Sequence, residues 1–213
     1  MAIEKELFRQ VMGRFATGVT VVTTSSNGVL AGLTVNSFCS VSLNPPLVLI
    51  CVDNNSSTLP LLRESKIFAV NMLSKNQEEW SRGFATNSPE RFEHFCYAPY
   101  HTAATGSPII EDVLAFIDAR IVAEYPGGDH VIFIGQVEAM GTPQTTAFVD
   151  SNGRTENNMP ATNNGNGKHT AHKEEDPLLY YGGQYRHMTK LFHEPSLVEE
   201  YHEGNLEEPA RNR

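Results

Sequence analysis

One stretch near the start of the chain places apolar residues at helical spacing. Between positions 4 and 15, one face of an α-helix would carry Leu7, Phe8, Val11, Met12 and Phe15. Two shorter stretches, 58–65 and 77–84, also fit helices, and Ser57 or Thr58 is a suitable N-cap for the first of them. The pattern therefore predicts a small number of short helices.

Runs of β-branched and other apolar residues predict strands along much of the remaining chain. These runs cover positions 19–24, 29–35, 47–52, 67–73, 115–125, 131–137 and 178–181. Asn27-Gly28 joins the first two runs as a tight hairpin, and positions 126–129 join the two late runs. Many strands, few helices and hairpin connections favour a mainly β fold over a doubly wound sheet, so we expect a β-barrel with peripheral short helices.

Composition and charge exclude several classes of protein. The chain has 213 residues, 40% of them hydrophobic, and 16 basic against 25 acidic residues give a net charge of −9. No apolar run reaches the roughly 18 residues that a membrane-spanning helix needs, and the charged N-terminus lacks the apolar stretch of a secretory leader. The negative charge argues against general binding of nucleic acid.

The cysteines and histidines indicate neither a disulfide scaffold nor a metal centre. Cys39, Cys51 and Cys96 form no C-x-x-C pair and leave an odd count, which favours a reducing compartment, and we expect the cytoplasm. His169 and His172 lie three positions apart, but two ligands do not make a metal site, and we expect none.

Two polar segments stand apart from the predicted barrel. Positions 151–176 contain only three apolar residues, so we expect a surface insertion over about 143–176, either a tolerated loop or a lid or partner-binding segment. Positions 194–213 hold six Glu and two Arg, an acidic tail that is either a solvated terminus or an arm docked on a dimer partner. We expect one domain over 1–193, followed by this tail.

Three clusters of residues carry candidate chemistry. The first, at positions 34–42, is crowded with hydroxyls and amides; it suits the edge of a planar heteroaromatic ring, or it is an ordinary polar loop. The second, at 53–58, opens a predicted helix and suits a phosphate, or it simply caps the helix. The third is the turn at 127–130, where His130 could reach the rim of a pocket. Neither a Rossmann nor a P-loop glycine pattern occurs.

Several motifs in order resemble the flavin reductase-like family. They are FATGVTVVTT at 15–24, GLTVNSF at 32–38, SVSLNPPLV at 40–48, FAVNML at 68–73, GDH at 128–130, PLLYY at 177–181 and GQY at 183–185. The resemblance covers about residues 5–142 and 177–190. It implies an FMN-binding split β-barrel, usually a homodimer, that reduces FMN or FAD with NADH or NADPH and often serves as the reductase component of a two-component monooxygenase.

The resemblance also implies a site, position by position. The loop that lines the isoalloxazine would contain Thr34, Val35, Asn36, Ser37, Cys39 and Ser40. The flavin phosphate would lie at Ser56, Ser57 and Thr58. The flavin tail or phosphate would contact Arg82, Gly83 and Phe84. His130 would lie at the nicotinamide side of the pocket, with Tyr185 nearby.

Hydride transfer between stacked rings needs no protein acid or base, so the catalytic residue we expect, His130, is a positioning group. The insertion and the acidic tail depart from compact members of the family. An alternative function remains on the same fold: a protein that binds FMN tightly and carries electrons, or binds flavin, without NAD(P)H turnover.

Overall fold

The computed structural model describes residues 3–86, 93, 95, 97, 99–142, 145–149, 155–158 and 176–188, with the backbone alone at 155–158. Cys96, His169, His172, most of the predicted insertion and the whole acidic tail lie outside the described residues. The predictions for those segments therefore stay predictions.

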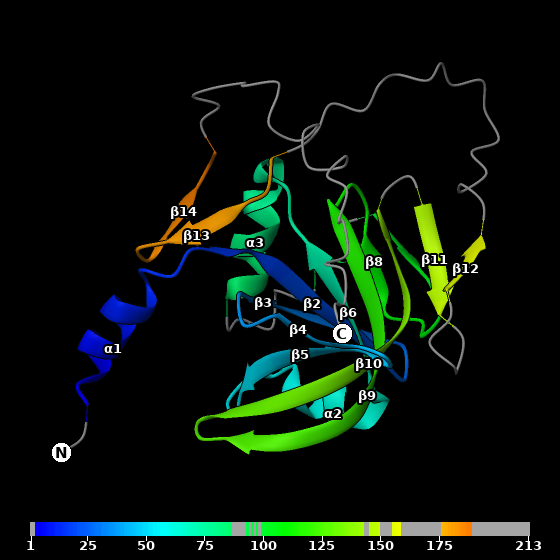
Figure 1. Cartoon of the computed structure of the whole chain (residues 1–213), viewed down its shortest axis with the longest axis horizontal. Helices are drawn as coiled ribbons and strands as arrows, with labels where there is room; N and C mark the ends of the chain where they lie inside the picture. Colours follow the sequence, from blue (N-terminus) through cyan, green and yellow to red (C-terminus); the bar gives the residue numbers. More distant parts are fainter. Residues whose placement is uncertain are drawn as a thin grey trace, which may run out of the picture.

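Strands dominate the fold, as the hydrophobic pattern predicts (Figure 1). The main sheet runs in the order β12-β11-β10-β9-β6-β2-β3, and β5 pairs with β10 and with β4. Its strands are β2 (Thr20–Ser26), β3 (Val29–Val35), β4 (Cys39–Leu43), β5 (Pro46–Asp53), β6 (Ile67–Met72), β9 (Ala115–Gly127), β10 (His130–Thr142), β11 (Thr145–Val149) and β12 (Thr155–Asn158).

Smaller elements surround this sheet. A three-stranded sheet joins β1 (Thr17–Gly18), β13 (Leu179–Tyr181) and β14 (Gln184–Arg186), and β7 (Tyr100–Thr102) pairs with β8 (Pro108–Ile110). The helices are α1 (Lys5–Met12), α2 (Leu59–Ser65), the 3₁₀ turn η1 (Lys75–Gln77) and α3 (Glu78–Ala85). None of the helices among the described residues is long and apolar enough to cross a bilayer.

The curled main sheet is a barrel that stays open along one seam. The first half of β10 lies between β9 and β5, and its second half lies between β9 and β11. Among the described residues, no backbone ladder joins β3 to β5. The expected mainly β fold is confirmed, and the sheet is not closed between β3 and β5.

The predicted elements largely match the observed ones. Strand β3 has the predicted bounds, 29–35, and the turn before it places both Asn27 and Gly28 at positive φ, 50° and 80°. These are the values that a tight hairpin turn requires of both central residues, and asparagine and glycine tolerate them best.

Other elements differ from the sequence predictions. The polar stretch around Cys39 forms β4 because its backbone pairs with β5, and polar composition does not prevent pairing at a sheet edge. Thr155–Asn158, predicted as loop, forms β12 against β11 for the same reason. The short strands β7, β8 and β14 were not predicted, since three residues give too little pattern.

Two apolar clusters fill the fold. One lies inside the barrel and includes Ile50, Phe68 and Phe133; the other lies between the barrel and α3 and includes Leu73 and Phe84. Glycine is required where α3 crosses β3, because a Cβ at Gly32 would lie 2.9 Å from two ring carbons of Phe84. This close approach lets Phe84 lie flush against the strand that borders the seam.

Candidate functional site

Strand pairing brings the second and third candidate clusters together. His130 lies opposite Asp53 in the ladder between β10 and β5. Beyond the ladder, the Asn54 N–H donates to the Asp129 carbonyl at 3.0 Å, and the Asn54 side-chain amide donates to the Gly128 carbonyl at 3.2 Å. The turn at 127–130 therefore lies directly on the turn at 53–58.

His130 is held by its neighbour in sequence. Its Nδ1 lies 2.7 Å from Oδ1 of Asp129, and 42% of its side chain is exposed. The hydrogen bond and the charge of His130 hold the pKa of Asp129 below its usual range. The carboxylate fixes one ring nitrogen and so orients the imidazole, which leaves Nε2 as the nitrogen that can meet a ligand.

A cavity of about 280 Å³ lies at the seam, beside these two turns. It is lined by Leu33, Thr34, Asp53, Asn55, Ser56, Phe84 and Ala85. Three elements thus meet there: the end of β3, the turn after β5, and the last turn of α3. We refer to it as the seam cavity.

The turn that leads into α2 is held mainly by its own side chains. Asp53 Oδ1 accepts from the Asn55 N–H at 2.7 Å, and Ser56 Oγ accepts from the Thr58 N–H at 3.3 Å. The hydroxyl of the buried Thr58 donates to the carbonyl of Gly32 on β3 at 3.2 Å. Of the three residues expected to receive the phosphate, Ser57 is the exposed one.

Thr34 connects the seam cavity to α3. Its hydroxyl donates to the carbonyl of Ser81 at 2.6 Å, and the hydroxyl of Ser81 lies 2.8 Å from that of Tyr185. Tyr185 also packs edge-on against Tyr180, with ring centroids 5.6 Å apart. These contacts place Tyr185 on the side of α3, where it ties the β13–β14 hairpin to the wall of the seam cavity.

Arg82 lies on the same helix. Its Nε and Nη2 donate to Glu78 Oε1 at 2.8 and 2.6 Å, and its Cζ lies 4.7 Å from the centroid of the Tyr185 ring. Next to it, the Gly83 carbonyl accepts from the Thr86 hydroxyl at 2.9 Å, which closes the end of α3.

A second cavity, of about 400 Å³, lies where β1, β2 and the middle of the predicted flavin loop meet. Asn36 and Phe38 line it, together with Thr17, Leu73 and Leu178 among others. Asn36 therefore belongs to this cavity, whereas Thr34, two residues earlier, lines the seam cavity.

The rest of the predicted flavin loop is bound to its own strands. Val35 packs against the barrel core, and its carbonyl accepts from the hydroxyl of Thr20. Ser37 Oγ donates to the Cys51 carbonyl at 2.9 Å and accepts from the Cys51 N–H at 3.2 Å, so a side chain extends the β4–β5 ladder. Burial raises the pKa of the Cys51 thiol.

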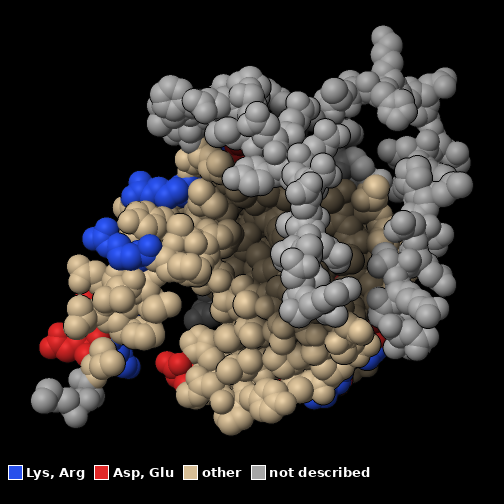
Figure 2. All heavy atoms as spheres, in the orientation of Figure 1, with Lys and Arg blue, Asp and Glu red and all other residues tan. Residues whose placement is uncertain are grey.

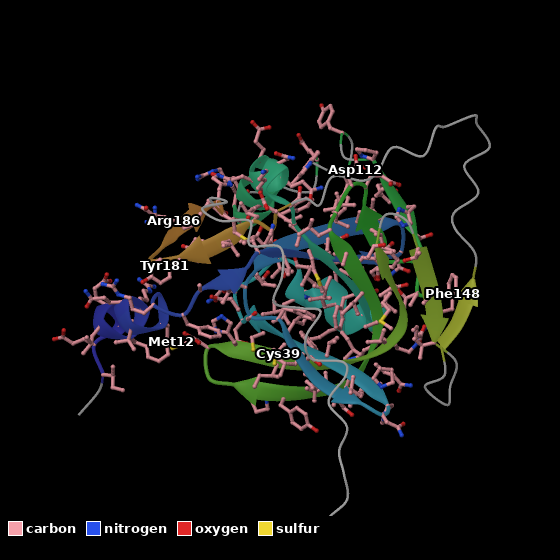
Figure 3. The ribbon with its side chains drawn as sticks, turned by 45° about the horizontal axis from the view of Figure 1, so that its top comes forward. Met12, Cys39, Asp112, Phe148, Tyr181 and Arg186 are labelled. Atoms are coloured by element: carbon pink, nitrogen blue, oxygen red, sulfur yellow. The ribbon has the colours of Figure 1, made fainter. Side chains whose placement is uncertain are left out.

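Cys39 and Ser40 follow on β4, and both are exposed. Figure 3 labels Cys39 near the centre of the molecule. The Cys39 thiol lies 3.1 Å from the Ser40 carbonyl, and Cys39 and Cys51 are free cysteines. Among the described residues, no group of three or more potential metal ligands comes together.

The structure thus brings Thr34, Ser56 and Phe84 into one cavity and sets Asn36 in another. Sequence reasoning did not assign a role to Asp53, Asn55 or Ser81. Asp53 and Asn55 lie in the polar turn at 53–58, so the sequence already indicated their place in the site. Nothing in the sequence indicated Ser81, because a serine inside a short helix is common.

The lining of the seam cavity fits part of a flavin. Leu33 and Phe84 supply apolar surface for a ring or carbon chain, and the Asp53 carboxylate and Asn55 amide can accept from hydroxyl groups such as those of a ribityl chain. An open β-barrel with such a cavity beside a histidine-bearing turn agrees with the class of flavin-binding split-barrel proteins that the sequence resembles.

Comparison with known proteins identifies the family. The model of the flavin reductase like domain matches residues 12–189, and the chain belongs to this family. It is 38% identical, over 65% of its length and 72% of the relative, to the reductase subunit HsaB of a flavin-dependent monooxygenase from Mycobacterium tuberculosis.

Two further comparisons agree with this assignment. The chain is 39% identical to an NADH-dependent FAD reductase from Streptomyces globisporus, over 74% of this chain and 87% of that one. Its fold matches the solved structure of flavin reductase PheA2 with a TM-score of 0.68 and 34% identity, covering 88% of this chain and 99% of the other.

Proposed function

We propose that this protein is an NAD(P)H:flavin oxidoreductase that reduces FMN or FAD and supplies the reduced flavin to a partner monooxygenase. The observation that carries the proposal is the contact between the two turns, which places His130 beside the seam cavity. The relatives named as a monooxygenase reductase subunit and as an NADH-dependent FAD reductase support it.

The residues of the site bind and orient. Leu33 and Phe84 exclude water from one side of the seam cavity, while Thr34 and Asp53 line its polar side. Flavin, when bound, supplies the chemistry by accepting a hydride from the nicotinamide. His130, fixed through Asp129, is positioned to hydrogen-bond a nicotinamide carboxamide and so to set the orientation that transfer requires.

Steady-state turnover tests the proposed activity. NADH or NADPH oxidation, followed as loss of absorbance in air, should depend on added FMN or FAD and saturate with each. If nicotinamide oxidation proceeds at the same slow rate with and without flavin, the proposal is wrong. In that case the tightly bound FMN carrier is the function to examine next.

A homodimer is part of the proposal, and helix α1 supports it. The apolar residues of α1 are exposed rather than packed on the barrel, with Phe8 at 58%, Val11 at 60% and Met12 at 52%. Figures 1 and 3 show α1 extending from the body of the protein, with Met12 labelled on it. An apolar helix face of this kind is typical of a surface that another chain covers.

Light scattering tests the dimer. Phe8→Glu with Val11→Glu should convert a dimer into a monomer, because two charges would be placed in the apolar contact, whereas Glu6→Gln on the same helix should leave the dimer intact. A monomeric unmodified protein would contradict this part of the proposal.

A cytoplasmic location is proposed on the free thiols of Cys39 and Cys51, which suit a reducing compartment.

A further inference from the structure

The arginines in the described part of the chain divide into two groups. The first group, in which each side chain lies 2.6 Å from a glutamate oxygen, consists of Arg63, Arg82 and Arg120. The second group makes no ion pair and no side-chain hydrogen bond among the described residues, and it consists of Arg9, Arg14 and Arg186. All three side chains of the second group are exposed.

The three unpaired arginines lie on two segments that contact each other. Arg9 is in the last turn of α1, Arg14 follows that helix by two residues, and Arg186 ends β14. The N–H of Gly182, in the turn between β13 and β14, donates to the carbonyl of Gly13 at 2.8 Å. Figure 2 shows basic side chains where Figure 1 places this end of α1 and the hairpin. We refer to the surface of Arg9, Arg14 and Arg186 as the cationic surface.

The cationic surface stands out in a chain whose net charge is −9. Like charges on neighbouring segments repel one another, so a contact with carboxylates would relieve that repulsion. Exposed apolar side chains lie on the same segments, with Met12 at 52% and Tyr181 at 36%. Figure 3 labels Met12, Tyr181 and Arg186 on one side of the molecule. A surface of this composition fits a segment that carries several carboxylates and a few apolar residues.

The chain itself carries a segment of this composition outside the described residues. The acidic tail, positions 194–213, holds six Glu and two Arg, and its apolar residues are Leu197, Val198, Tyr201 and Leu206. The tail begins eight positions after Arg186, and an extended chain of that length spans about 26 Å. The tail therefore starts within reach of the cationic surface.

We propose that the acidic tail docks on the cationic surface of its own chain, with its glutamates against Arg9, Arg14 and Arg186. The tail of the same chain is favoured over that of another copy, because a short tether gives it a high effective concentration. Arg9 and Val11 are two positions apart and so do not share a face of α1. Docking at Arg9 thus leaves Val11 to the second copy in the proposed homodimer, and it does not depend on flavin reduction.

Crosslinking in the full-length protein tests this contact. Arg14→Lys and Arg186→Lys keep the positive charge and introduce an amine, which a carbodiimide joins to a neighbouring carboxylate. Arg63→Lys is the matched control, because the Arg63 side chain is 50% exposed on α2 and paired with Glu124. Mass spectrometry of the single-chain band from a denaturing gel identifies the partner of each introduced amine.

The proposal predicts crosslinks to the tail from one surface only. Arg14→Lys and Arg186→Lys should each crosslink to tail glutamates within one chain, and Arg63→Lys should not. In about 1 M salt the tail crosslinks should disappear, because the screening length falls to about 3 Å. If neither variant crosslinks to the tail at low salt, the proposal is wrong. Tail crosslinks found only between two chains would overturn the assignment to the chain's own tail.

Proteolysis is an independent measure that introduces no amine. A glutamyl endopeptidase cleaves the tail after its glutamates, and docking should slow this cleavage at low salt. The triple variant Arg9→Glu, Arg14→Glu and Arg186→Glu should be cleaved in the tail about tenfold faster, the order that three exposed ion pairs can supply. Arg63→Glu should leave the rate unchanged. Equal rates of tail cleavage in the triple variant and the unmodified protein would overturn the proposal.

Discussion

His130 and Asp53 lie opposite each other on β10 and β5, although 77 positions separate them in the sequence. This pairing joins the turn that carries the expected catalytic residue to the turn that borders the seam cavity. The position of His130 relative to a bound ligand is therefore set by a backbone ladder, which is more rigid than a free loop.

His130→Ala should raise the Michaelis constant for NADH or slow flavin reduction about fivefold, as expected for one lost hydrogen bond of about 1 kcal/mol. Flavin affinity should not change. Stopped-flow absorbance measures the reduction, and His101→Ala is the matched control, because His101 is similarly exposed and lies 2.9 Å from Glu111. Unchanged kinetics in the His130 variant would remove its positioning role.

Ser57 and Thr58 should respond differently to substitution by alanine. Ser57 is exposed, so Ser57→Ala should weaken FMN more than riboflavin if its hydroxyl meets the phosphate. Thr58→Ala should instead lower the free energy of unfolding by about 1 kcal/mol, because its hydroxyl donates to the buried backbone of Gly32. Fluorescence titration and urea unfolding measure the two effects. Equal losses of FMN and riboflavin in Ser57→Ala would exclude a phosphate contact.

Gly32→Ala should destabilise the protein by about 1–3 kcal/mol, because the new methyl group overlaps the ring of Phe84 at 2.9 Å. It should also weaken flavin binding, since Phe84 lines the seam cavity. Gly18→Ala is the control, because nothing lies within 4 Å of a Cβ at that position. Equal unfolding midpoints in urea for the two variants would show that Phe84 moves aside without cost.

Asp118 should make the stability depend on pH. Burial raises the pKa of this carboxyl above its ordinary value of 3.8, against the hydrogen bonds from Thr105 that lower it. Folding therefore favours the protonated form. The stability that this group contributes is complete below pH 3.8 and is lost as pH rises through the raised folded-state pKa.

Asp118→Asn removes this titration. Relative to the unmodified protein, the variant should gain stability from acidic to neutral pH, measured as the difference in free energy of unfolding at several pH values. Asp112→Asn, at an exposed turn, controls for the loss of one carboxylate. A stability difference that stays constant with pH would show that Asp118 titrates alike in both states.

The sequence predicted the strands of the barrel better than the contacts that build its site. Runs such as 29–35 are periodic and bounded by turn residues, so local pattern suffices to place β3. The family resemblance placed Thr34 and Phe84 in one site, and they do share a cavity. Local pattern also predicted the helix α1, although it ends at Met12 rather than Phe15, and no residue of it is buried; whether its apolar residues meet the barrel depends on tertiary packing.

The other contacts of the site could not be predicted, because they join residues that lie far apart in the sequence. The hydroxyl of Thr58 looks available for a phosphate in the sequence, yet β3 supplies a carbonyl acceptor from 26 positions away. Tyr185 reaches Ser81 across 104 positions, through a hairpin too short to show a pattern. Such contacts follow from strand order and register, which residue types alone do not determine.

Anaerobic reduction of flavin shows whether the protein transfers hydride from a nicotinamide to flavin. The purified protein is mixed with FAD or FMN in the absence of oxygen, and the flavin absorbance near its visible maximum is followed after NADH or NADPH is added. If the protein reduces flavin with a nicotinamide, the flavin should bleach fully, within seconds, only when protein and nicotinamide are both present. A protein that binds flavin and leaves it oxidised under these conditions is not a flavin reductase.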